Sequence, residues 1–437
     1  MNRRTLVVSF LAVLAITGSV FIHHMIRCGS PSNKDEDLKH RLERLRSIPY
    51  TTTTPWVVSG EPSGVTVYDS LRSWRGYNIF CSAVSPEVLL MDMHGKIVHR
   101  WHYPDQRKRR WTWTAPLMLP NGDVVVVSKR KNIKRLDWNS NLLWKLDVAA
   151  HHEVSLAPDS TIYTIICEMK EYRGMAVRFA CILHLTLDGE EIDRWSTYDH
   201  LDEIKASFDT RSFLDNILDS LAACRGIGSV ETTVPGRLEV WKGKDGNIYD
   251  YFHMNTVSVL PENESGGDPR FKPGNLLICC RNVNQIAILD RDTREILWVW
   301  GEGELQWPHH PTMLANGNIL VFDNGPIRRY SRVIELDPVS RKIVWQYVGD
   351  PPETFYTYEK GSAQRLPNGN TLICEGDRGR ALEVTVSGEI VWEWINPMQE
   401  RMRRVQLYRM IRLSPDYVEP HLERATQKAT SQAAVSD

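Results

Sequence analysis

The sequence predicts an all-β protein built as a six-bladed β-propeller, because two short motifs alternate along most of the chain. The first motif is a tight turn that leads into an apolar strand. Its copies are LPNGDVVVVS, PGNLLICC, LANGNILVFDNG, LPNGNTLICEG and, more loosely, APDSTIYTII. Asn-Gly between apolar runs is a strong hairpin signal, since both residues tolerate positive φ.

The second motif is a hydrophobic strand that carries tryptophan near its end. Its six tryptophans are Trp101, Trp144, Trp195, Trp298, Trp345 and Trp392. They recur at intervals of roughly 40–50 residues, apart from one longer gap, and such a period with several short strands per unit is typical of propellers. Six copies predict six blades. The alternative is a β-sandwich whose segments are similar by accident.

The domain boundaries follow from where this pattern starts and stops. The propeller is expected over residues 50–400, with a helical insertion at about 200–221 that covers one face as a lid or rim. Residues 401–437 form a C-terminal extension, which is expected to pack on the outside and to end in a disordered segment.

The N-terminus differs in composition from the rest. Arg3 and Arg4 precede an uncharged, mostly apolar run from Thr5 to Ile22. This run is at the short end for a membrane-spanning helix and long for the core of a signal peptide. We expect an uncleaved signal anchor or transmembrane helix over residues 1–28, a polar stalk over 29–49, and a propeller on the periplasmic or extracytoplasmic side. A cleaved signal peptide is the alternative.

Composition excludes some functions. The 437 residues are 42% hydrophobic and 24% charged, with a net charge of −1. A nucleic-acid-binding protein would normally show a basic patch or stripe, so nucleic acid is not an expected partner. The eight cysteines form no CxxC pair, which argues against a cysteine metal site.

Candidate site residues lie just before the innermost strands of the predicted blades. In a propeller these positions converge at the central axis. Aligning the repeats on their turns places different polar residues at or beside one position, as a site requires. They are His152, Asn255, His310 and Ser362, with His253 and Arg281 beside them.

Each of these residues also has a structural interpretation. A single histidine before a strand is often a capping or surface residue, and Arg281 could be a rim salt-bridge partner. Three histidines at equivalent sites favour function. Three histidines also suit a metal such as zinc or copper. An arginine and an asparagine beside them favour a bound oxyanion instead, so neither a metal nor a cofactor is expected.

Four longer segments resemble the arylsulfotransferase family. They are WPHHPTMLANGNILVFDNG, DYFHMNTVSVL with CCRN after it, HHEVSLAPD and GSAQRLPNGNTLICEG, and the resemblance runs from about Gly76 to Pro397. It implies transfer of a sulfuryl group, independent of PAPS, from a phenolic sulfate donor to a phenol acceptor through a sulfohistidine.

By motif position, the resemblance implies that His310 is the nucleophile. Arg281, Asn255 and His253 would hold the sulfuryl oxygens, and either His152 or His253 would exchange a proton with the phenol. The family places a hydroxyl residue in the site, for which Ser362 is the candidate and Thr371 a second choice.

The chain departs from the best-known members of the family, because residues 29–75 are too few for their added N-terminal β-domain. It resembles a shorter, membrane-anchored branch. Two alternatives to an arylsulfotransferase remain: a hydrolase or lyase on the same scaffold, and a non-catalytic propeller that binds a ligand or a protein.

Overall fold

The computed structural model describes residues 62–104, 113–208, 218, 239–243, 246–400 and 403–436. The expected anchor (1–28) and stalk (29–49) lie outside these residues, as does most of the expected insertion (200–221), of which α3 (Leu201–Ser207) is described. Among the described residues, no helix combines the length and apolar character needed to cross a membrane.

Six sheets, each built on four antiparallel strands, confirm the six-bladed propeller. Blade 1 consists of β29 (Met410–Leu413), β2 (Tyr77–Cys81), β3 (Glu87–Met91) and β4 (Ile97–His102). Blade 2 consists of β5 (Trp113–Met118), β6 (Val124–Ser128), β7 (Asn132–Leu136) and β8 (Leu142–Leu146). Blade 3 consists of β9 (Ala150–Leu156), β10 (Ile162–Tyr172), β11 (Met175–Leu185) and β12 (Glu191–Ser196), and is widened by β14 (Gly246–Asp250) and β13 (Glu239–Gly243).

The other three blades follow in chain order. Blade 4 consists of β15 (Met254–Val259), β16 (Leu276–Cys280), β17 (Gln285–Leu289) and β18 (Ile296–Trp300). Blade 5 consists of β19 (Pro308–Met313), β20 (Ile319–Asp323), β21 (Arg332–Asp337) and β22 (Lys342–Tyr347). Blade 6 consists of β23 (Ser362–Arg365), β24 (Thr371–Glu375), β25 (Arg380–Val384), β26 (Ile390–Ile395) and, as a fifth outer strand, β1 (Gly64–Tyr68).

Short elements complete the described part. They are the 3-10 helices η1 (Pro269–Phe271), η2 (Arg281–Val283), η3 (Pro352–Thr354) and η4 (Gly376–Arg378), the strand pair β27 (Gln399–Glu400) and β28 (Arg403–Arg404), and helix α5 (Pro415–Ser436).

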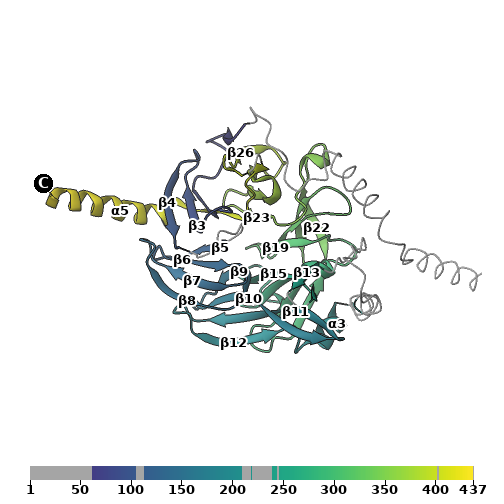
Figure 1. Cartoon of the computed structure of the whole chain (residues 1–437). Coiled ribbons are helices and arrows are strands. Elements are labelled where there is room, and N and C mark those ends of the chain that lie inside the picture. Colours follow the sequence, from purple (N-terminus) through teal and green to yellow (C-terminus); the bar gives the residue numbers. More distant parts are fainter. Residues whose placement is uncertain are drawn as a thin grey trace, which may run out of the picture. The chain divides into compact units, whose positions relative to one another are not determined.

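The first strand of each blade lies nearest the axis. Figure 1 shows β5, β9, β15, β19 and β23 near the centre, with β4, β8, β12, β22 and β26 farther out, and the first strands of neighbouring blades contact one another. The second strands are packed on both faces, so their side chains are buried without a break, as in VVVVS of β6 and LLICC of β16. This explains why the turn motif leads into continuous apolar runs rather than into alternation.

The repeated tryptophans bind neighbouring blades together. In four blades, the indole Nε1 donates to a backbone carbonyl in the β-turn between the outer two strands of the next blade. These bonds are Trp144 to Leu187 (2.7 Å), Trp298 to Pro338 (3.2 Å), Trp345 to Val386 (2.8 Å) and Trp392 to Met93 (2.9 Å). The rings of Trp298 and Trp392 are buried and those of Trp144 and Trp345 are partly buried, while the single polar group of each finds a partner.

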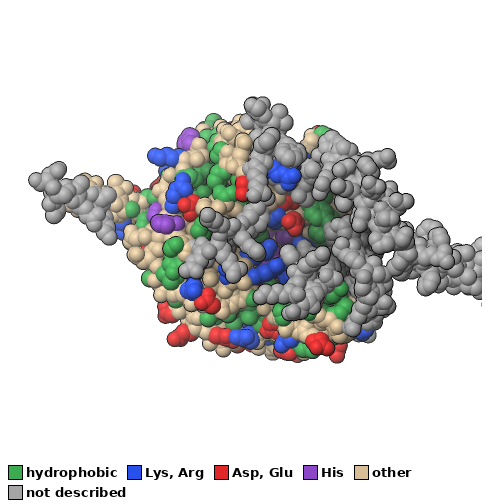
Figure 2. Space-filling view, viewed as in Figure 1, with side chains coloured by type: hydrophobic (Ala, Val, Ile, Leu, Met, Phe, Trp, Pro, Cys, Tyr) green, Lys and Arg blue, Asp and Glu red, His purple; other side chains and the backbone are tan. Residues whose placement is uncertain are grey.

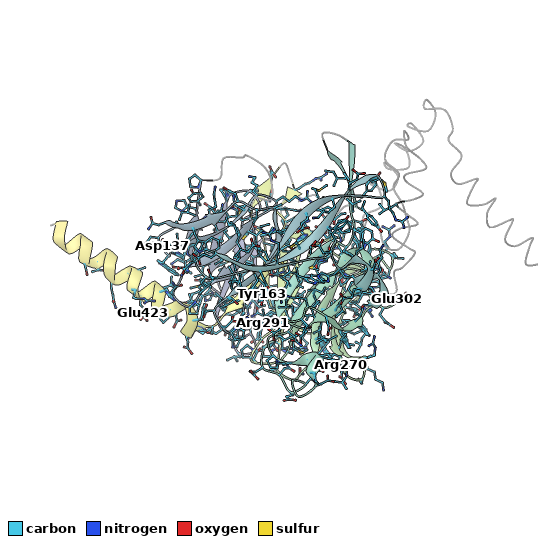
Figure 3. The ribbon with its side chains drawn as sticks, turned by 90° about the horizontal axis from the view of Figure 1, so that it is seen from below. Asp137, Tyr163, Arg270, Arg291, Glu302 and Glu423 are labelled. Carbon is cyan, nitrogen blue, oxygen red and sulfur yellow. The ribbon has the colours of Figure 1, made fainter. Side chains whose placement is uncertain are left out.

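Other polar contacts between blades lie farther from the axis. Figure 3, seen from below, shows Tyr163 of blade 3 beside Arg291 of blade 4. The Nε of Arg291 donates to the Tyr163 hydroxyl at 3.1 Å. Glu423, also labelled there, lies on α5.

The propeller does not end at residue 400 as expected. Strand β29 pairs antiparallel with β2, so a segment near the C-terminus supplies the innermost strand of blade 1 and closes the ring. The sequence does not predict this closure, because no turn motif marks the closing strand. Residues 415–436, expected to be partly disordered, form α5, whose first part packs against blades 1 and 2 through Tyr417, Val418 and Leu422.

Arg412 joins the two ends of the ring. Its guanidinium is fully buried, forms an ion pair with Glu383 of β25, and donates from Nε to Asn78 of β2 at 3.0 Å. The same group lies over the Trp392 ring at 4.6 Å. Arg412 therefore ties blade 6 to blade 1 at the point of closure.

Candidate active site

The innermost strands of adjacent blades carry left-handed residues at the same end. The register of β5, β9 and β19 shifts at a bulge, and the bulges contain Ala115, His152 and His310 with φ of 44°, 62° and 47°. His253, directly before β15, has φ of 47°. Positive φ is uncommon outside glycine, and such strained residues cluster at functional sites. Three of these four residues are the predicted site histidines.

His310 is held from both its backbone and its ring. The backbone amide donates to Thr256 Oγ1 at 3.1 Å, and Nδ1 lies 3.2 Å from the carbonyl oxygen of Ala363 in blade 6. A carbonyl can only accept, so Nδ1 carries the proton and Nε2 keeps its lone pair. Among the described residues, none forms a hydrogen bond with Nε2.

The burial of His310 favours this neutral form. Its side chain is 8% exposed. Burial lowers the pKa of the imidazole well below its usual value, and the positive charge of Arg409 lowers it further. A neutral imidazole with a free Nε2 lone pair is a competent nucleophile at neutral pH.

Thr256 and Asn255 support the bulge that carries His310. The Thr256 hydroxyl accepts from the His310 amide and donates to Asn255 Oδ1 at 3.1 Å, and Asn255 Nδ2 donates to the Pro308 carbonyl at 2.8 Å. Both side chains are 1% exposed. Blade 4 thus fixes the inner strand of blade 5 on both sides of His309–His310.

Four side chains from three blades form a hydrogen-bonded series that we name the proton chain: Tyr408, His152, His253 and Asp250. Tyr408 Oη lies 2.5 Å from His152 Nδ1, His152 Nε2 lies 3.1 Å from His253 Nε2, and His253 Nδ1 lies 2.7 Å from Asp250 Oδ2. Arg178 pairs with the same Asp250 oxygen at 3.3 Å.

The widened blade 3 places the acidic end of the proton chain. Strand β14 runs parallel to β11 and sets Asp250 opposite Arg178. Both residues are buried, so the carboxylate has a charged partner away from water. The chain turns directly from β14 into His253, which explains how Asp250 can reach Nδ1.

Arg281 lies beside these histidines. It follows β16, is 2% exposed, and stacks its guanidinium over the Trp307 ring at 4.5 Å. Burial, followed by the charge of Arg281, lowers the pKa of His309 to about 3. The Nδ1 of His309 is shared by the Trp307 carbonyl at 3.0 Å and Asn324 Oδ1 at 2.7 Å, which gives the DNG motif after β20 a role in orienting this ring.

Ser362 begins β23, the neighbour of the His310 strand. It is 1% exposed, and its hydroxyl has no hydrogen-bond partner among the described residues. A buried hydroxyl without a partner is costly, which makes it a candidate to contact a ligand. Thr371, the second choice, lies in β24 and also has a buried hydroxyl without such a partner.

Sequence reasoning missed Tyr408 and Arg409. Both precede β29 in the closing segment and are buried, and Arg409 forms a two-point ion pair with Glu153, with both contacts at 2.6 Å. A signal was present: the turn motif occurs five times but the tryptophan strand six times. Blade 1 therefore needs an inner strand from another part of the chain. The residues of that strand are expected to lie near the axis.

Figure 2 shows His side chains and Lys or Arg side chains together in a hollow near the centre of the viewed face. No group of three or more His, Cys, Asp or Glu side chains in the described part of the chain is arranged to hold a metal ion. The arrangement offers the Nε2 atoms of His310 and His309, neither of which has a hydrogen-bond partner among the described residues, together with a buried proton chain and two arginines.

Solved structures with a similar fold share little sequence with this chain. A protein of unknown function from Bacteroides caccae is 13% identical with a TM-score of 0.48, over 78% of this chain and 99% of that chain. A catalytically inactive virginiamycin B lyase from Staphylococcus aureus, solved with quinupristin, is 10% identical with a TM-score of 0.42, over 79% and 88%. Likeness at this level says nothing of function. No curated protein matches the chain.

A family model does match. The model for arylsulfotransferase (ASST) covers residues 115–397, which is well over half of the chain and includes His152, His253, Arg281 and His310. The match confirms the resemblance seen in the sequence, and the chain belongs to the arylsulfotransferase family.

Proposed function

We propose that this protein transfers a sulfuryl group from a phenolic sulfate ester to a phenol through a sulfohistidine on His310. One observation carries the proposal: Nδ1 of His310 bonds a backbone carbonyl, so Nε2 holds a lone pair in a buried, neutral ring. Membership of the arylsulfotransferase family supports the reaction class.

The reaction then has two halves. In the first, His310 Nε2 forms a bond to sulfur while the bond between sulfur and the aryl oxygen breaks, and the aryl oxygen leaves with the electron pair and receives a proton. In the second, the acceptor phenol oxygen bonds sulfur, the bond from nitrogen to sulfur breaks, and the acceptor gives up its proton. The proton chain supplies and recovers this proton, so each cycle is balanced.

Buried arginine would stabilise the negative charge of the sulfuryl group. The transferred SO₃ group spreads negative charge over three oxygens, as in phosphoryl transfer, where positioning and electrostatics do most of the work. Arg281 is fixed on Trp307 next to the histidines and would hold these oxygens, with the Ser362 hydroxyl as a neutral donor. The Asn255 amide donates one of its two hydrogens to the Pro308 carbonyl and accepts from Thr256, so Asn255 would act mainly by fixing His310.

The test uses the purified full chain with 4-nitrophenyl sulfate, with and without phenol. We expect nitrophenolate release that depends on phenol, and a mass increase of about 80 Da, one SO₃ group, on the His310 peptide when phenol is omitted. His310→Ala should abolish both. His94→Ala, at an exposed position between β3 and β4, should change neither.

Three results would contradict the proposal. Release that needs no phenol would indicate a hydrolase. Modification at another residue would move the nucleophile. A folded protein that releases nothing from several aryl sulfates would favour a propeller that only binds its ligand.

A further inference from the structure

The proton chain has one end that is still open. A neutral imidazole has two nitrogens, and the hydrogen bonds of His152 occupy both, with Tyr408 on Nδ1 and His253 on Nε2. In His253 both nitrogens are also engaged, by His152 and Asp250. Neither ring has a nitrogen left for a phenol.

Tyr408 differs from the histidines in this respect. A phenolic hydroxyl has one donor and two acceptor positions, and His152 takes only one of them. The side chain is 8% exposed, its ring stacks on His152 at 5.7 Å, and it lies in the electrostatic range of Arg281, Arg409 and Glu153. Among the described residues, the Tyr408 oxygen is thus the end of the proton chain that keeps hydrogen-bonding capacity for another molecule.

We infer that Tyr408 is a catalytic acid and base of this enzyme, that it exchanges the proton directly with the phenolic oxygen, and that it suits the enzyme to sulfates of weakly acidic phenols. This inference rests on the proposed function. The reason for the substrate class is the match between acid and substrate. Tyrosine is itself a phenol, whose ordinary pKa is about 10, and proton transfer is most useful between groups of similar pKa. Burial raises the pKa of Tyr408 above that value, which matches it to the least acidic phenols.

The proton moves along the chain as follows. When the chain holds one extra proton, His152 Nδ1–H donates to the Tyr408 oxygen, and the Tyr408 hydroxyl points to the leaving aryl oxygen. As the bond between sulfur and that oxygen breaks, the Tyr408 proton passes to the aryl oxygen and the His152 proton passes to Tyr408. His152 is left neutral. The acceptor phenol reverses each transfer in the second half.

The charges of the site favour this cycle. Asp250, as a carboxylate on His253, stabilises the positive charge that the extra proton places on the two imidazoles. Burial lowers the pKa of His152 well below its usual value and raises that of Tyr408, so both side chains are neutral in the resting enzyme. A bound sulfate ester adds a negative charge nearby, which favours uptake of the extra proton.

The experiment compares donors whose leaving phenols need a proton to different degrees. The donor half is measured in single turnovers with enzyme in excess, for 4-nitrophenyl sulfate (leaving phenol pKa about 7) and for phenyl sulfate (pKa about 10). In Tyr408→Phe we expect the rate with phenyl sulfate to fall about 100-fold or more, while that with 4-nitrophenyl sulfate changes by less than about threefold. With 4-nitrophenyl sulfate and phenol together, sulfated His310 should accumulate, because the acceptor can no longer lose its proton efficiently.

Tyr163→Phe is the matched control. Tyr163 is also buried, and its hydroxyl accepts a hydrogen bond from Arg291, but it lies in the outer contact between blades 3 and 4. It should leave both rates unchanged. An equal loss with both donors in Tyr408→Phe would show a structural role and overturn the inference, as would no loss with either. If the unaltered protein forms no sulfohistidine at all, the proposed function fails instead.

Discussion

The strained backbone of His310 gives a local explanation for its chemistry. A left-handed residue at a bulge turns its side chain out of the regular alternation of the strand, so the ring can meet a carbonyl of the next blade. Thr256 holds the same bulge from the other side. The nitrogen proposed as the nucleophile is therefore fixed by three adjacent blades rather than by the rotamer of one side chain.

Removal of the Thr256 hydroxyl tests how much its hydrogen bond with the His310 amide contributes to catalysis. In Thr256→Val the His310 amide loses its acceptor, and we expect kcat to fall about tenfold to 100-fold with little change in the thermal midpoint, since small displacements of a reacting group are costly. Thr197→Val, directly after the outer strand of blade 3, is the control, because its equally buried hydroxyl donates only to the Ala180 carbonyl. Steady-state kinetics with 4-nitrophenyl sulfate measure the effect, and equal loss in the two variants would argue against a specific role of Thr256.

At the scale of elements, the closing strand β29 differs from the other inner strands. Five inner strands continue directly into their own blades, but β29 pairs with strands from the other end of the chain. The ring is held there by Arg412, whose buried charge is balanced by Glu383. Removing one member of a buried pair leaves the other charge without compensation, whereas replacing both by apolar groups often restores stability.

The single and the double replacement of this ion pair are therefore expected to have different effects on stability. Arg412→Met should lower the free energy of unfolding by about 3–5 kcal/mol, measured by urea denaturation. Adding Glu383→Leu to the same protein should recover most of that loss. If the double variant is less stable than the single one, the pair itself stabilises the ring more than its desolvation costs.

The elements also show what the sequence could predict. Six tryptophan strands and five turns were enough for the blade number, because each blade repeats the same local pattern. The partners of Trp144 or Trp392 were not predictable, since they are carbonyls in the next blade. Likewise, the position of His310 followed from the repeat, but Tyr408 and Asp250 reached the site through pairings of β29 and β14 that have no local signal.

At the scale of the whole molecule, the site places several neutral histidines in the interior. Burial lowers the pKa of His151, His152 and His310 well below the usual value, and that of His309 to about 3. In the unfolded chain these groups titrate near pH 6.5. At pH values between the folded and the unfolded pKa of these histidines, the unfolded state binds more protons than the folded state. The free energy of unfolding therefore rises with pH in this range. The loss of folding stability is absent above about pH 6.5, and it grows as the pH falls toward the folded pKa values.

We therefore expect acid to destabilise the whole fold. The thermal midpoint should be lower at pH 5 than at pH 7 by about 5 °C or more, since several groups act together. His310→Gln, which cannot titrate, should reduce this difference, while His94→Gln at an exposed position should not. Differential scanning calorimetry at several pH values measures it. A midpoint that does not depend on pH would mean that these histidines bind protons as readily in the folded state as in the unfolded chain.

Closure by β29 also has a consequence for biosynthesis. The ribosome must reach residue 413 before blade 1 has its innermost strand, and until then the edge of β2 has no partner. A growing chain can fold single blades but holds neither Tyr408 nor Arg409 at the axis. Premature termination anywhere before that point yields an open array of blades instead of a weakened enzyme, so this protein gains its ring and its chemistry in one late step.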